Sequence, residues 1–123
     1  MINLQGKSPK LIVIGDLMID HYLWGACERV STEAPVQIVN VNDETTSLGG
    51  AGNVVHNLKT LGATVDVISV IGECEISNEL KKLLSDIEVE TKYLVTQKDR
   101  ITSQKSRIIS SQQQVVRFDR EST

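Results

Sequence analysis

The hydrophobic pattern of the chain contains two short runs that are dominated by apolar residues. Residues 10–15 (KLIVIG) and 65–72 (VDVISVIG) are rich in β-branched side chains, and each run ends in glycine. Runs of this kind are typical of strands whose two faces are both covered, as in a parallel sheet. The two segments are therefore predicted to be strands of a parallel sheet, with residues 10–15 buried on both faces.

Two other segments carry apolar residues at helical spacing. The first extends over residues 54–61 and is followed by Gly62, in the position of a C-terminal cap. The second extends over residues 76–87, with Ser77 as a candidate N-cap. Because the first helix lies between the two predicted parallel strands, the pattern predicts a βαβ unit.

A different pattern precedes the first helix. Residues 21–27 and 36–41 have strand character, and the polar connection between them lacks helical periodicity. Strands joined in this way are expected to be antiparallel, forming a lid over about residues 20–27 and 36–47 that is separate from the parallel sheet. Apolar residues occupy both faces of the second strand, which favours a lid that is covered on both sides, as by a partner subunit.

The last third of the chain has strand character throughout. Strands are predicted at residues 90–95, 102–109 and 114–119. The last two are expected to form a hairpin with the polar turn SSQQ at 110–113. Alternation then places Lys105 and Arg107 on one face of its first strand.

Composition and charge restrict the class of protein. The chain has 40% hydrophobic and 24% charged residues, as in an ordinary globular domain. No secretory signal is present, no apolar run approaches the roughly 20 residues of a membrane span, and the two cysteines match no metal-ligand spacing. A cytoplasmic protein without membrane partner or metal site is expected, and the scarcity of aromatic residues argues against a nucleic-acid partner.

Basic side chains are concentrated near the end of the chain. Residues 1–91 carry 6 basic and 13 acidic side chains, whereas residues 92–123 carry 7 basic and 3 acidic ones. A basic segment either attracts an anionic ligand or is the solvated face of the hairpin, and for most of these charges the solvated face is favoured.

The glycine-rich turn LGGAGN at residues 48–53 carries the first candidate chemistry. Gly49 and Gly50 lack a Cβ atom and so let a ligand approach the backbone, and the following helix presents unpaired N–H groups. The turn suits an oxygen-rich ligand such as a sugar or a phosphate, or it only starts the helix; the turn alone does not decide. Asp16 and Asp20 follow the first strand, at the edge where α/β sheets bind ligands.

Several stretches, taken in order, resemble the N-terminal part of the ribokinase-like carbohydrate kinase family. They are VIGDLMID at 13–20, LGGAGNV at 48–54, LGA at 61–63 with the strand that ends at 72, and two stretches nearer to one subfamily, ERVSTEAPV at 28–36 and QQQVVRFD at 112–119. The resemblance covers about residues 10–121. It implies an α/β fold, namely the N-terminal portion of a ribokinase-like three-layer fold with a parallel central sheet and a small antiparallel β lid.

The resemblance also implies a sugar site. Asp20 matches a carboxylate that hydrogen-bonds sugar hydroxyls, and Gly49 and Gly50 match a double-glycine turn that contacts the sugar through its backbone. Asn53 matches an asparagine that contacts a hydroxyl. Two alternatives stay open: Asp20 as a turn or cap residue, and Asn53 as a cap of its own helix. Asp16 either touches the substrate or orients the loop.

Basic residues of the hairpin are candidates for a substrate phosphate. Arg107 is the first candidate, with Lys105 two residues earlier on the same face, because a guanidinium matches phosphate oxygens. Arg117 is a second candidate. The alternative is an exposed hairpin whose charges are merely solvated.

The subfamily that these stretches resemble phosphorylates the anomeric hydroxyl of D-glycero-D-manno-heptose 7-phosphate, with ATP and Mg²⁺, in ADP-heptose and lipopolysaccharide core synthesis. The Gly-Ala-Gly-Asp stretch that supplies the catalytic base and anion hole in this family does not occur in the 123 residues. The chain is therefore expected to comprise a leader (1–9) and an N-terminal kinase fragment (10–123) that is inactive alone and holds no cofactor.

The sequence leaves two alternatives to this function open: a ribokinase-like kinase for another sugar, and a non-catalytic module that forms a homodimer through its lid strands. One stretch departs from the family pattern. Residues 73–77 (ECEIS) stand where these kinases often have an acidic pair and a glycine. The departure concerns a turn after the second parallel strand and leaves the sugar site unchanged.

Overall fold

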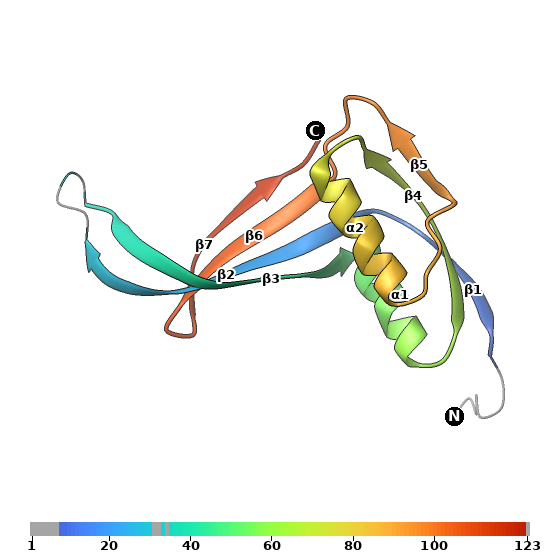
Figure 1. Cartoon of the computed structure of the whole chain (residues 1–123), viewed down its shortest axis with the longest axis horizontal. Coiled ribbons are helices and arrows are strands. Elements are labelled where there is room, and N and C mark those ends of the chain that lie inside the picture. Colours follow the sequence, from blue (N-terminus) through green and yellow to red (C-terminus); the bar gives the residue numbers. More distant parts are fainter. Residues whose placement is uncertain (1–7, 31–32, 34, 123) are drawn as a thin grey trace.

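The computed structural model describes residues 8–30, 33 and 35–122, which form two sheets and two helices (Figure 1). The first sheet is parallel, in the order β1-β4-β5, and consists of β1 (Lys10–Ile14), β4 (Thr64–Gly72) and β5 (Leu94–Gln97). The second has the order β3-β2-β6-β7 and consists of β2 (Leu17–Val30), β3 (Gln37–Gly50), β6 (Ser103–Ser110) and β7 (Gln113–Arg120). The helices are α1 (Ala51–Thr60) and α2 (Glu75–Asp86).

The predicted βαβ unit is confirmed. β1 pairs in parallel with β4, from Lys10 opposite Thr64 to Ile14 opposite Ile68, and α1 lies in the connection between them. The core forms where the two helices pack between the sheets, and it also includes residues from β2 and β3. Its fully buried members are Ile19, Val55, Val67, Ile71, Leu80, Leu84 and Val89. The α/β class expected from the sequence is therefore correct.

The expectation that β1 is buried on both faces is wrong. Ile12 and Ile14 are 61% and 76% exposed, whereas Val13, between them, packs on the core. The helices cover only one face of this sheet, and β1 is an edge strand in the described residues. A continuous apolar run does not reveal whether a second layer is present.

The lid is antiparallel, as predicted, but larger than expected. β2 and β3 pair from Leu17 opposite Gly50 to Val30 opposite Gln37. The predicted hairpin of β6 and β7 also exists, and it turns at Ser111 and Gln112, which both have positive φ. This hairpin joins the lid through a parallel pairing of β6 with β2, so that the lid is a four-stranded sheet. In Figure 1 this sheet extends well beyond the helices.

The helix caps agree with the sequence at one end only. Gly62 has φ +95 and its N–H donates to the Lys59 carbonyl, which confirms it as the end of α1. Ser77 is not the N-cap of α2, because the helix begins after Cys74. The Ser77 hydroxyl instead donates to the Gly72 carbonyl and lies 2.7 Å from Thr102 Oγ1, so it links β4 to the chain before β6.

Two predicted boundaries differ from the structure. The strand expected at residues 90–95 begins only at Leu94, because residues 88–93 form the turn that returns the chain from α2 to the sheet. Residues 1–7 of the predicted leader lie outside the described residues, and the Pro9 carbonyl accepts a hydrogen bond from Thr64 N–H (2.8 Å). Neither described helix is long and apolar enough to cross a membrane.

Candidate functional site

The glycine-rich turn joins β3 directly to α1. Gly50, the last residue of β3, has φ 57 and ψ −131, a conformation that L side chains rarely adopt. A Cβ atom at this position would also lie 2.7 Å from the Asp16 carbonyl oxygen. That carbonyl accepts the N–H of Ala51, the first residue of the helix (2.9 Å). The turn therefore requires glycine for its own geometry, whether or not a ligand binds.

Asp20 lies against the same turn. It is on β2, opposite Ser47 of β3, and its carboxylate covers the backbone of Gly49. A Cβ atom at Gly49 would lie 2.6 Å from Asp20 Oδ2. Asp20 and Gly49, 29 positions apart in the sequence, thus form one surface, as expected for a shared site.

An ion pair joins Asp20 to Arg107 of β6. Arg107 Nη1 lies 3.0 Å from Asp20 Oδ1, and the two side chains are only 20% and 24% exposed. The guanidinium also lies over the Tyr22 ring, 5.4 Å from its centroid. The hydrogen bond to Asp20 raises the pKa of Arg107 above its ordinary value. The pair is therefore a fixed, charge-assisted contact of the lid sheet.

Register places the other basic candidates on the same face of this sheet. Lys105 is directly opposite Asp20 across the parallel pairing, and Arg117 is opposite Arg107 across the β6–β7 hairpin. Arg117 forms an ion pair with Asp119 (3.1 Å). Lys105 has no ion pair within the described part of the chain. The face thus carries the acidic Asp20 and Asp119 beside three basic side chains.

Asn53 and Asp16 occupy different positions relative to this face. Asn53 lies in the first turn of α1 and is exposed, and no described hydrogen bond engages its amide. The helix has no side-chain cap at its start, so the interpretation of Asn53 as a cap of its own helix is not supported. Asp16 is exposed, and its backbone carbonyl holds the start of α1.

Sequence reasoning missed the aromatic residues beside Asp20. Tyr22 and Trp24 follow it at intervals of two along β2, and their rings stack with centroids 5.8 Å apart. Trp24 Nε1 donates to Thr45 Oγ1 of β3 (3.2 Å). The available signal was the period of two itself, because alternate residues of a strand share a face.

The opposite face of the lid sheet is occupied by internal contacts. His21 Nδ1 lies 2.9 Å from Ser106 Oγ, and His21 Nε2 pairs with Glu44. Thr46 donates to Glu79 of α2 (3.0 Å), which ties the lid to the helices. The face that carries Asp20 is therefore the one open to a ligand.

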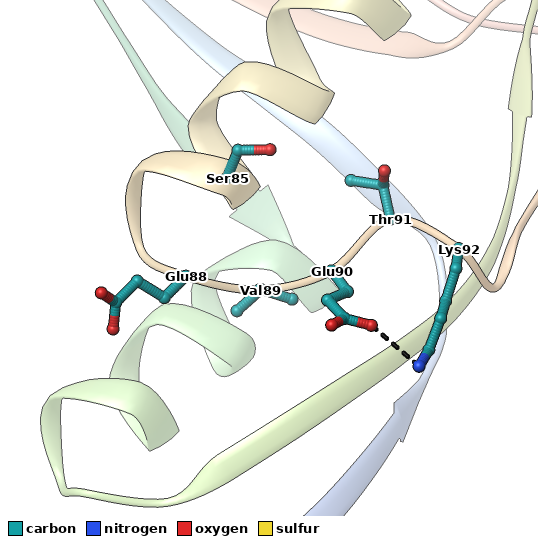
Figure 2. Close-up of a pocket in the computed structure, with 6 residues that line it drawn as sticks. All are labelled: Ser85, Glu88, Val89, Glu90, Thr91 and Lys92. Atoms are coloured by element: carbon teal, nitrogen blue, oxygen red, sulfur yellow. Dashed lines mark ion pairs between the residues drawn. The ribbon is translucent and has the colours of Figure 1, made fainter.

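The described cavities do not coincide with this face. Figure 2 shows one of about 500 Å³ at the end of α2, lined by Ser85, Glu88, Val89, Glu90, Thr91 and Lys92. It precedes β5 and so lies at the amino end of that strand, whereas parallel sheets bind ligands at the carboxyl ends. Asp16 and Ser69 are among the residues that line a smaller cavity of about 220 Å³. The Ser69 hydroxyl is buried and has no hydrogen-bond partner among the described residues.

No three His, Cys, Asp or Glu side chains among the described residues are grouped so that they could hold a metal ion. The 123 residues contain no Gly-x-x-x-x-Gly-Lys-Ser/Thr loop. The site as described can hold a polyhydroxylated, anionic molecule on one face of the lid sheet.

The chain is similar in sequence to known carbohydrate kinases. The family model described as pfkB family carbohydrate kinase matches residues 8–123. Curated relatives named bifunctional protein HldE, from Aliarcobacter butzleri and Sulfurimonas denitrificans, are 63% and 58% identical over 119 residues. These alignments cover 97% of the chain and 25% of each relative. The chain thus spans about a quarter of the length of these relatives.

Solved structures share the fold at low identity. A carbohydrate kinase from Agrobacterium tumefaciens has a TM-score of 0.67 at 21% identity, covering 91% of this chain and 35% of that one. The nucleoside kinase of Methanocaldococcus jannaschii, an archaeal member of the ribokinase family, has a TM-score of 0.65 at 16% identity. The match covers 94% of this chain and 38% of that one. A ribokinase from Cryptococcus neoformans in complex with ADP has a TM-score of 0.61 at 20% identity, and the match covers 94% of this chain and 34% of that one. The ribokinase-like fold class is confirmed.

Proposed function

The chain belongs to the pfkB family of carbohydrate kinases, and we propose that it is the N-terminal, sugar-binding part of an ATP-dependent kinase. The proposed substrate is D-glycero-D-manno-heptose 7-phosphate, phosphorylated at its anomeric hydroxyl to give the 1,7-bisphosphate for ADP-heptose and lipopolysaccharide core synthesis. The identity of 63% with a bifunctional HldE protein over nearly the whole chain supports this choice of sugar.

The observation that carries the proposal is the surface that Asp20 forms with Gly49. An ionised carboxylate accepts hydrogen bonds from two hydroxyls at once, and it lies so close to Gly49 that the carboxylate and the glycine turn form one surface. We assign Asp20, Gly49 and Gly50 to the sugar. Asn53, which is exposed at the start of α1 and whose amide has no hydrogen bond in the described part of the chain, is assigned to a further hydroxyl. Asp16 acts on the loop through its carbonyl.

The substrate phosphate is assigned to the basic side of the same face. Lys105 lies opposite Asp20 and has no ion pair in the described residues. In the same part of the chain, Arg107 donates a hydrogen bond to Asp20 through only one of its guanidinium nitrogens, Nη1. Arg117 is a further candidate on the neighbouring strand. A sugar held at Asp20 would thus extend its phosphate along β6, toward cations that match its charge.

Residues 10–123 are proposed to lack the catalytic base, the anion hole and the sites for ATP and Mg²⁺, which would be supplied by a C-terminal portion of the kinase domain. Phosphoryl transfer depends on positioning and on charge stabilisation at the transferred group. A site that holds only the sugar neither positions the nucleotide nor stabilises charge on its transferred phosphoryl group. The kinase is further proposed to be cytoplasmic and to form a homodimer through its lid strands. Exposed Val41 and Val116 on the lid support the dimer.

Two measurements test the proposal. The full-length protein that carries this chain is expected to phosphorylate heptose 7-phosphate at least about 100-fold more efficiently than unphosphorylated ribose or fructose, measured as kcat/KM. A preference for another sugar would assign the chain to a different kinase of the family. The 123 residues alone are expected to show no sugar-dependent ATP turnover. Robust turnover would contradict the proposal that the catalytic groups lie in a C-terminal portion of the kinase domain.

A further inference from the structure

We infer that Arg107 is a positioning residue that sets the stereospecificity of the sugar site by holding Asp20 in one orientation. The inference rests on the proposed function, because it concerns the carboxylate that is assigned to the sugar hydroxyls. It differs from the assignment of Arg107 to the phosphate: here the guanidinium acts on the substrate through another residue.

The two oxygens of Asp20 have different surroundings. Oδ1 accepts a hydrogen bond from Arg107 Nη1 at 3.0 Å, whereas Oδ2 lies over the backbone of Gly49. A carboxylate that accepts a hydrogen bond at one oxygen cannot rotate about its Cβ–Cγ bond without breaking that hydrogen bond. Arg107 therefore directs the second oxygen toward the glycine turn, where the sugar is proposed to lie.

The guanidinium is itself held in place by an aromatic ring. Its carbon lies 5.4 Å from the centroid of the Tyr22 ring, which is directly opposite Arg107 in the parallel register. A cation over an aromatic face is attracted by the ring, more strongly where water is partly excluded. Only 20% of the Arg107 side chain is exposed, so both of its contacts are protected from water.

A positioning role and a phosphate contact have separable consequences. Loss of a phosphate contact lowers kcat/KM by the same factor for every substrate that carries the phosphate. Loss of the fixed orientation of Asp20 lowers kcat/KM most for the sugar whose hydroxyls match that orientation. Discrimination between epimers therefore falls. The ratio of two rates is also independent of the fraction of enzyme that is folded.

The test measures kcat/KM of the full-length protein for heptose 7-phosphate and for an epimer at one ring hydroxyl that carries the same phosphate. Arg107→Gln is expected to reduce the ratio of the two values by about tenfold, the scale for one mispositioned polar contact. In an Asp20→Asn background the same substitution is expected to change the ratio less than twofold, because Arg107 acts through Asp20. Arg120→Gln, on the other face of the same sheet, is the matched control and should leave the ratio unchanged.

The outcomes separate this inference from the proposed function. If the wild-type protein phosphorylates no sugar phosphate, the proposed function fails. If it does so but Arg107→Gln lowers both rates equally, the inference is overturned and the proposed function stands. Should Arg107→Gln show no activity at all, Arg107→Lys keeps the charge but loses the planar fork, and an unchanged epimer ratio in that variant would likewise overturn the inference.

Discussion

The carboxylate of Asp20 lies directly over the backbone of Gly49, so close that a methyl group on Gly49 would be 2.6 Å from Oδ2 and 2.9 Å from Cγ. Both distances are far shorter than van der Waals contact. Gly49 is therefore required by the position of the aspartate. The glycine turn and the acidic residue after the first strand form a single structural unit.

Gly49→Ala tests this relationship. The new methyl group must displace the Asp20 carboxylate, so the KM for the sugar is expected to rise at least about tenfold while the protein stays folded. Gly62→Ala is the control, because Gly62 has positive φ but nothing within 4 Å of the added methyl group. It should lower the free energy of unfolding by about 1 kcal/mol and leave KM unchanged. An unchanged KM in Gly49→Ala would contradict the arrangement.

Much of the parallel sheet could be predicted from the sequence, because its signals are local. The apolar run of β1, the glycine after α1 and the helical spacing of its core residues each report a short segment. The sugar site was predicted from motifs of the same kind, with Asp20 and Gly49 as its centre. These residues do lie together in the structure.

The contacts that could not be predicted are long-range. The pairing of β6 with β2 brings Arg107 to Asp20 across 87 positions, and nothing in either segment indicates a partner that far away. The exposure of Ile12 and Ile14 was missed for a similar reason, since apolar composition does not reveal how many layers cover a strand. The type and position of Ser77 suit a helix cap, whereas its hydroxyl donates to the Gly72 carbonyl of β4.

The link between Ser77, Thr102 and Gly72 should be important for stability. Thr102 is 3% exposed, and its hydroxyl accepts the Gly72 N–H at 2.8 Å. Thr102→Val leaves this buried donor without a partner, so the free energy of unfolding, from urea titration, is expected to fall by about 1–3 kcal/mol. Thr60→Val removes an exposed hydroxyl that donates to the His56 carbonyl and should cost less than about 0.5 kcal/mol. Equal losses in the two variants would argue against the buried link.

The proposed lid dimer makes a prediction about Val41 on β3, which is 48% exposed. A lysine at this position would have to be desolvated in a lid–lid interface, so Val41→Lys is expected to raise the dimer dissociation constant at least about tenfold. Val54 on α1 has the same exposure but lies outside the lid, and Val54→Lys should leave the dissociation constant unchanged. Sedimentation equilibrium measures both. A wild-type protein that stays monomeric at high concentration would contradict the proposed dimer.

Cys74, at the start of α2, is predicted to be reactive near neutral pH. Burial raises the pKa of the thiol, but hydrogen bonds with Ser77 and Thr102 outweigh this effect and lower the pKa to about 7. Only the thiolate is nucleophilic, so the alkylation rate of Cys74 by iodoacetamide should rise with pH and reach half its maximum near pH 7.

Mass spectrometry of the Cys74 peptide follows this rate, and Cys74→Ser confirms the assignment of the modified site. Ser77→Ala removes the hydroxyl that lies 3.4 Å from the sulfur, so the midpoint is expected to move to higher pH and the rate at pH 7 to fall. A wild-type midpoint near the value of about 8.5 for an unperturbed cysteine would show that these hydrogen bonds do not stabilise the thiolate.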